Sequence, residues 1–224
     1  MVARFAAAFL LVCACASSAC AKKGEQGDEK GRAVFDRTKQ SGATYAAYSW
    51  NWVRGADGAP LQGWSAEFHK GALHRVETPD VRVVADCAAG TGTAYFVRED
   101  RTESGPQFAR SACGINSNPA DAEIEWAGRK DGRFGALDTI RIADGQYRRT
   151  YAVNSDGALL AAEYFAVDPK VDCVQSEALA VEAALPDGDA FAPESLGRSI
   201  VPEKNRVAPQ APAGDYWLGG FRCR

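Results

Sequence analysis

Cysteine residues offer the most definite chemistry in this sequence. Three of the seven cysteines, Cys13, Cys15 and Cys20, belong to the N-terminal stretch that ends at residue 21, which leaves four. An even number in an oxidising compartment favours disulfides, and four cysteines allow three pairings. Closeness in the sequence and the flanking predicted strands favour the pairs Cys87–Cys113 and Cys173–Cys223.

The sequence offers little for metal binding or catalysis. No two of these four cysteines have the C-x₂₋₄-C spacing of a structural zinc site. The two histidines, His69 and His74, have no third ligand nearby and are expected to be solvated strand residues. A G-x-S-x-G nucleophile motif is absent. The glycine-rich residues 90–93 precede an apolar strand pattern, so they lack the helix N-terminus that binds phosphate. We therefore predict no catalytic residue, no metal and no cofactor.

Aromatic residues gather on two neighbouring predicted strands. Tyr48, Trp50 and Trp52 alternate with smaller residues on the first strand, and Trp64 and Phe68 do so on the second. Same-face residues of adjacent antiparallel strands lie ~5 Å apart, so these rings should meet. Two interpretations stay open. The rings form an ordinary core, or they line a ligand pocket in a curved sheet.

The N-terminal residues 1–21 have the pattern of a secretion signal. Arg4 is followed by an apolar run over residues 5–12 and then by small residues as far as Ala21. The run is too short to span a bilayer, which needs about 20 apolar residues. We therefore predict a signal peptide and export to the periplasm or the outer membrane.

The site of signal cleavage has two interpretations. Residues 17–20 resemble a lipobox ending at Cys20, although Ser17 stands where leucine is preferred, while Ala19 and Ala21 suit ordinary cleavage after residue 21. The charged, Gly-containing residues 22–32 suit a flexible tether between an anchor and a domain. This favours lipidation of Cys20, with free secretion as the alternative.

The rest of the chain has the size and composition of one globular domain. Hydrophobic residues make up 46% and charged residues 25%, with a net charge of −3. No basic cluster breaks this mixture, so nucleic acid is not an expected partner. We divide the chain into a tether and short helix (22–40), a β-rich domain (41–185) and an extended C-terminal segment docked on that domain (186–224).

Alternation of apolar and polar residues, typical of strands with one buried face, runs through the β-rich domain. Asp57-Gly58 separates the two aromatic strands and predicts a hairpin. The other predicted strands are 73–78, 81–86, 93–98, 123–128, 138–143, 146–153 and 158–167, while 171–184 suits a strand or a short helix. The expected fold is mainly β (α+β), an antiparallel meander curled into an open or unclosed barrel with one or two short helices.

Three segments resemble the LolA/LolB-like lipoprotein-carrier superfamily. Residues 71–79 are similar to a strand that carries an arginine, here Arg75, and ends near a proline. Residues 83–87 and Tyr95 resemble a hairpin in which an aspartate, here Asp86, opens a turn, although Cys87 stands where the family has glycine. Residues 146–167 are similar to the closing hairpins. The resemblance implies an unclosed barrel covered by helices that binds acyl chains or lipoproteins.

The resemblance implies a binding protein rather than an enzyme, whose partner is a hydrophobic ligand or an envelope protein. Arg75 and the five aromatic residues are the expected ligand contacts, and a lipid on Cys20 would hold the protein at the membrane. Two alternatives remain. A closed barrel without a covering helix would favour a lipocalin-like or inhibitor-like module. A histidine buried beside a nucleophile and a carboxylate would favour a small periplasmic hydrolase.

Overall fold

The fold was obtained as a computed structural model, which describes residues 23–39, 42–55, 60–116, 122–144, 147–168, 171–185 and 189–209. The predicted signal peptide, Cys20 and Cys223 lie outside the described residues. The helices that the structure describes include none that is both long and apolar enough to cross a membrane.

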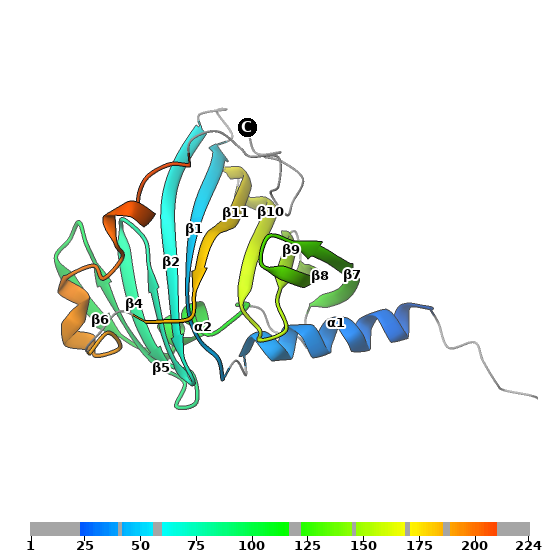
Figure 1. Ribbon diagram of the computed structural model, residues 1–224, viewed down its shortest axis with the longest axis horizontal. Helices are drawn as coiled ribbons and strands as arrows, with labels where there is room; N and C mark the ends of the chain where they lie inside the picture. The colour runs from blue at the N-terminus through cyan, green and yellow to red at the C-terminus, as the bar shows by residue number, and fades with distance from the viewer. Residues whose placement is uncertain are drawn as a thin grey trace, which may run out of the picture.

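The described residues form one antiparallel sheet of eleven strands in the order β6-β5-β4-β3-β2-β1-β11-β10-β9-β8-β7. All neighbours are consecutive in the chain except β1 and β11, which bring the two halves together (Figure 1). The edge strands β6 and β7 do not pair, so the sheet is unclosed, and the predicted mainly β meander is confirmed. The strands are β1 (Thr44–Gly55), β2 (Pro60–Lys70), β3 (Leu73–Glu77), β4 (Val81–Asp86), β5 (Thr91–Phe96), β6 (Arg101–Ser104), β7 (Glu123–Gly132), β8 (Gly135–Asp144), β9 (Tyr147–Val153), β10 (Leu159–Asp168) and β11 (Val171–Glu182).

The helices differ from the sequence expectation. Helix α1 (Lys23–Lys39) includes most of the charged stretch that we expected to be a tether, and α2 (Pro106–Ala112) lies in a stretch with no predicted element. The last turns of α1 bury Phe35 against the sheet, and Arg37 pairs with Asp138 of β8 at 2.9 Å. These contacts with distant strands stabilise a helix whose own sequence has little apolar character.

Both helices lie on the same face of the sheet. Helix α1 contacts β7 and β8, whereas α2 contacts β3, β4 and β5. The segment after α2 joins them, because Ile115 packs in the same cluster as Phe35 and its backbone N–H donates to Thr38 Oγ1 at 3.4 Å. We call this side the helix face.

The opposite side carries residues 189–206, which we call the strap. It contains the 3-10 helices η1 (Pro193–Gly197) and η2 (Glu203–Asn205), and in Figure 1 it crosses the β2–β6 half of the sheet in orange and red. Val201 and Ile200 pack against Ala46, Tyr48 and Phe68. The expected docking of the whole segment 186–224 stays a prediction, because residues 210–224 lie outside the described part of the chain. We call this side the strap face.

Candidate functional site

The predicted aromatic residues share the strap face. In the β1–β2 register Trp50 is opposite Trp64 and Ala46 is opposite Phe68, so the expected meeting of the two strands is correct. Tyr48 and Phe68 pack edge to face with centroids 5.8 Å apart, in a cluster with Val201. Trp50 is 7% exposed, and its Nε1–H donates to Gln62 Oε1 at 3.1 Å. Trp52 packs beside it. Whether these rings contact a ligand stays a prediction.

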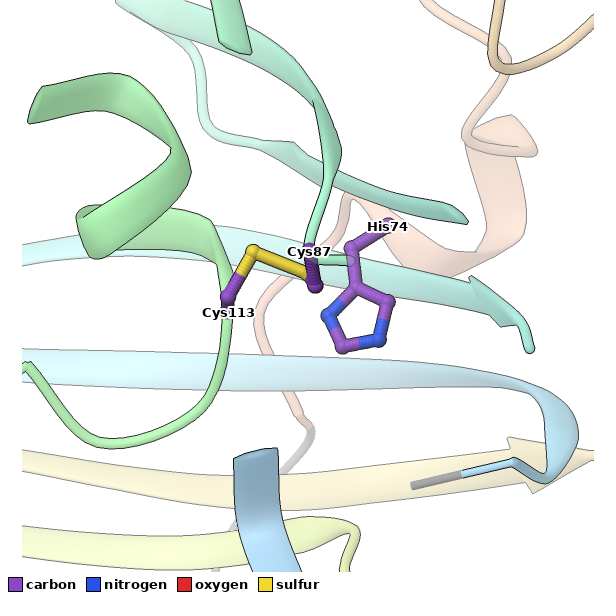
Figure 2. Close-up of side chains that lie close together, drawn as sticks. All are labelled: His74, Cys87 and Cys113. Carbon is purple, nitrogen blue, oxygen red and sulfur yellow. A yellow bond between two sulfur atoms is a disulfide. The ribbon is translucent and has the colours of Figure 1, made fainter. Parts of the chain in front are cut away.

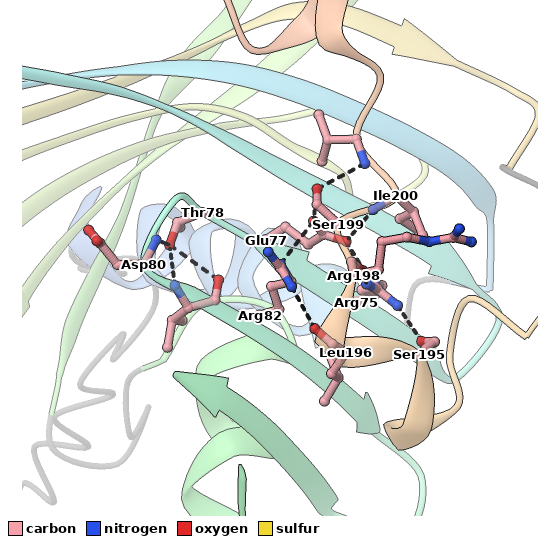
Figure 3. Close-up of polar contacts among 12 residues, drawn as sticks. Arg75, Glu77, Thr78, Asp80, Arg82, Ser195, Leu196, Arg198, Ser199 and Ile200 are labelled. Carbon is pink, nitrogen blue, oxygen red and sulfur yellow. Dashed lines mark hydrogen bonds and ion pairs between the residues drawn. The ribbon is translucent and has the colours of Figure 1, made fainter. Parts of the chain in front are cut away.

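Arg75 is fully buried beneath the strap (Figure 3). Its Nε donates to Glu77 Oε1 at 2.7 Å, and its two terminal nitrogens donate to the Ala190 and Arg198 carbonyl oxygens at 2.6 and 2.9 Å. Nη1 also donates to the Ser195 hydroxyl. Burial lowers the pKa of Arg75, and Glu77 opposes that effect. The contacts of Arg75 therefore fasten the strap to the sheet.

Glu77 receives hydrogen bonds from the same strap. The Ile200 backbone N–H donates to Glu77 Oε1 at 3.1 Å, and the Ser199 hydroxyl donates to Oε2. Arg82 lies 3.9 Å from Oε2 and also donates to the Leu196 carbonyl oxygen at 2.8 Å. A buried ion pair is tolerated only when its remaining polar atoms have partners, and here the strap supplies them.

A cleft of about 650 Å³ opens where the strap meets the β3–β6 edge of the sheet. Phe191 and Pro193 of the strap form one side of it, and Leu73 and Val84 form part of the sheet side. The polar lining includes Thr91, Thr93, Ser104 and Asp86, and the complete lining is Leu73, Val84, Ala85, Asp86, Gly90, Thr91, Gly92, Thr93, Ser104, Gly105, Pro106, Phe191 and Pro193.

Three polar residues of the cleft have hydrogen-bond partners within the protein. The Thr93 and Ser104 hydroxyls are 2.9 Å apart, and Asp86 Oδ1 accepts the Ala88 and Ala89 backbone N–H groups at 3.0 and 2.9 Å. The lining contains no lysine or arginine among the described residues. A site with apolar walls, a few hydroxyls, the Asp86 carboxylate and no cation suits a largely apolar ligand.

The two histidines are not solvated, contrary to the sequence expectation. His69 and His74 are 3% and 1% exposed on the helix face, where Tyr45 stacks on His69 with centroids 4.3 Å apart. The tight β2–β3 turn, in which Gly71 has φ +59°, makes the two histidines direct cross-strand partners. A spacing of five residues across a two-residue turn could have revealed this pairing.

Glu67, His69 and His74 form a chain of hydrogen bonds that we call the histidine relay. His69 Nε2 lies 3.3 Å from Glu67 Oε2, and His69 Nδ1 lies 3.1 Å from His74 Nε2. His74 Nδ1 lies 3.1 Å from the Ala112 carbonyl oxygen. Burial, with the neighbouring His69, lowers the pKa of His74 to about 4, so its imidazole is neutral at pH 7.

The Cys87–Cys113 disulfide lies beside His74 and joins the end of β4 to the end of α2 (Figure 2). It agrees with the sequence prediction. Cys173 is fully buried in β11 near Trp50 and Trp52. Its predicted partner, Cys223, lies outside the described residues, so the second pairing stays a prediction.

Comparisons with known proteins leave the family open. No family model and no curated protein matches the chain. Similar solved structures include an uncharacterized conserved protein from Thermus thermophilus, with 13% identity, a TM-score of 0.47 and coverage of 80% of this chain and 98% of that one. A LolA superfamily protein from Nitrosomonas europaea has 8% identity, a TM-score of 0.39 and coverage of 74% and 99%.

A third similar structure is MucB in complex with MucA(peri), with 11% identity, a TM-score of 0.45 and coverage of 72% of this chain and 60% of that one. A shared architecture does not determine function, and similarity of this extent identifies no ligand.

Proposed function

We propose that this protein is an exported binding protein that holds a hydrophobic ligand in the cleft between the strap and the β3–β6 edge of the sheet. The observation that carries the proposal is the cleft itself, of about 650 Å³, with apolar residues from both the sheet and the strap. Pockets of this size and lining are typical of small-molecule sites.

The strap network supports a binding role for this face. Arg75 and Glu77 fix residues 190–200 by direct hydrogen bonds, so the strap side of the cleft is held in place before a ligand arrives. A wall that is already ordered costs less entropy on binding than one that must fold around the ligand. The same surface could receive an acyl chain carried by an envelope protein.

A hydrolase is less well supported. It would need a nucleophile beside a buried histidine and a carboxylate. The histidine relay supplies the histidine and the carboxylate, but the hydrogen bonds of its rings go to Glu67, to each other and to Ala112. The two cysteines beside His74, Cys87 and Cys113, are joined in a disulfide.

Titration with a fluorescent fatty-acid probe tests the cleft. A Thr93→Trp variant would fill the cleft from its sheet side, and we expect it to weaken probe binding by at least tenfold. Thr102→Trp is the matched control, since Thr102 is exposed on β6 outside the cleft lining. Equal probe binding by both variants, or no binding by the wild type, would contradict the proposed site.

We further propose that a lipid on Cys20 anchors the protein in the envelope. Several acyl chains on one residue anchor a protein stably, whereas a single chain does so only marginally. A Cys20→Ala variant should then move from the membrane fraction to the soluble periplasmic fraction. A wild-type protein that is already soluble, with Lys22 as its first residue, would refute lipidation and leave the cleft proposal unaffected.

A further inference from the structure

The histidine relay holds too few protons to make all its hydrogen bonds when it is neutral. Its two ends are acceptors, namely the Glu67 carboxylate and the Ala112 carbonyl oxygen. Three contacts join these ends through two imidazole rings, and each contact requires one proton. Two neutral imidazoles carry only two N–H groups between them. One of the three contacts therefore lacks a proton.

A hydrogen bond to a carboxylate is stronger than one to a neutral carbonyl, so His69 Nε2–H donates to Glu67. The contact without a proton is then either the one between the two rings or the one at Ala112, depending on which nitrogen of His74 carries its proton. In the tautomer with that proton on Nε2, His74 Nε2–H donates to His69 Nδ1. His74 Nδ1 then carries a lone pair next to the Ala112 carbonyl oxygen, 3.1 Å away. A cation placed there would relieve the repulsion between the two acceptors.

Two sulfur atoms lie at this same place. Ala112 precedes Cys113, so Nδ1 is the ring nitrogen that faces the disulfide, and Figure 2 shows one nitrogen of His74 turned towards it. A ligand nitrogen of His74 and the Sγ atoms of Cys87 and Cys113 lie within 4.8 Å of one another. His74 is buried, and the two cysteines are partly exposed.

We propose that reduction of the Cys87–Cys113 disulfide creates a zinc site formed by the two cysteine sulfurs and His74 Nδ1. Zinc takes four ligands from cysteine and histidine, and sites with three protein ligands hold water in the fourth position. A ligating histidine almost always donates its other N–H to a carboxylate or another acceptor. Here His69 and Glu67 provide that support for His74.

The reaction requires a dithiol as reductant. The dithiol gives two electrons and two protons to the Cys87–Cys113 bond and becomes a cyclic disulfide, while both cysteines become thiols. Binding of Zn²⁺ then releases the two thiol protons to solvent, because thiolate is the ligand form. The neutral His74 ring loses no proton in this step. Oxidation would reform the disulfide and release the metal.

Cobalt titration of the full chain tests the site, because Co²⁺ replaces Zn²⁺ and its absorption bands report thiolate ligands. Protein reduced with a dithiol, which is then removed under anaerobic conditions, should bind one Co²⁺ with a sulfur-to-cobalt charge-transfer band, and Zn²⁺ should displace it. Oxidised protein should show no such band. A reduced wild-type protein without the band would overturn the proposal, whatever its folded state.

Matched variants separate this site from the other cysteines of the chain. The double variant Cys87→Ser, Cys113→Ser leaves every other cysteine of the protein in place and should lose the band. His69→Gln leaves the three proposed ligands in place, removes the imidazole that supports His74, and should weaken Zn²⁺ binding by about 10–100-fold. His74→Ala should weaken it further. An unchanged band in the double variant would assign the metal to other cysteines and overturn the proposal.

Discussion

Two neighbouring residues of β3 bury polar groups on opposite faces of the sheet in different ways. Arg75 points into the strap face, where each terminal nitrogen of its guanidinium has a partner and Glu77 balances its charge. His74 points into the helix face, where its ring lies between His69 and the Ala112 carbonyl oxygen. The strap face holds a charged pair, and the helix face holds two histidines beside a disulfide.

The difference follows from the chemistry of the two side chains. Arginine keeps its charge at any physiological pH, so its burial requires a full set of acceptors, which here come from the strap. Histidine can lose its charge when it is buried, so it tolerates an incomplete set of partners. The strap face therefore depends on a fixed structural network, while the helix face is where we propose a response to reductant and metal.

Removing Arg75 should have the largest effect on stability. Arg75→Met leaves Glu77 buried without its main partner, and breaking a buried pair from one side costs about 3–5 kcal/mol of the free energy of unfolding. Arg98→Met, which removes the exposed ion pair with Asp80, should cost less than about 1 kcal/mol. Urea unfolding of both variants checks this. Similar losses of unfolding free energy in the two variants would mean that the Arg75–Glu77 pair stabilises the fold no more than an exposed ion pair does.

Trp50→Ala should have a similar effect on the strap face. Its ring is buried and hydrogen-bonded to Gln62, so we expect a loss of about 3–5 kcal/mol. Fatty-acid probe titration of the same variant decides whether the aromatic residues contact ligand as well. An unchanged affinity would restrict Tyr48, Trp50, Trp52, Trp64 and Phe68 to the core, and a weaker affinity would extend the binding site beyond the cleft.

The disulfide should stabilise the helix face by a smaller amount. Cys87 and Cys113 are 26 residues apart in the sequence, and closing a loop of this length contributes about 3–4 kcal/mol. Thermal unfolding of the Cys87→Ser, Cys113→Ser double variant measures this contribution.

Peptide mapping without reductant should find Cys87 joined to Cys113 and should test the predicted pair Cys173–Cys223. A disulfide between Cys87 and Cys173 would contradict both predicted pairings.

Acid should weaken the helix face through His74. Its pKa of about 4 lies below the ordinary value of 6.5, so the unfolded chain binds the extra proton more readily. The free energy of unfolding should therefore fall by up to about 3 kcal/mol between pH 6.5 and 4. Glu67, His69 and Tyr45 face His74 or its partner, and Glu67 opposes the shift. His74→Gln should reduce this fall, whereas an identical pH profile would show that other groups cause it.

The sequence predicts the sheet better than it predicts the site. Period-two alternation and Asp-Gly turns indicate most strands, because these signals are local. The length of α1 could not be predicted, since its buried residues Val34 and Phe35 find partners on β7–β10, which are remote in the sequence. The cleft also escaped prediction, because it forms only when Phe191 and Pro193 return to strands about 100 residues earlier. Short β6 lacks an apolar pattern altogether.

Native mass spectrometry of protein purified from the envelope tests the binding proposal most directly. We expect the wild type to carry one bound lipid-sized molecule that is lost on collisional activation. Thr93→Trp should appear without it, and Thr102→Trp should keep it. Any covalent lipid on Cys20 would survive activation and is therefore distinguished from a cleft ligand. Wild-type protein without a bound molecule, or the same bound molecule in Thr93→Trp, would contradict the account of the cleft as a hydrophobic binding site.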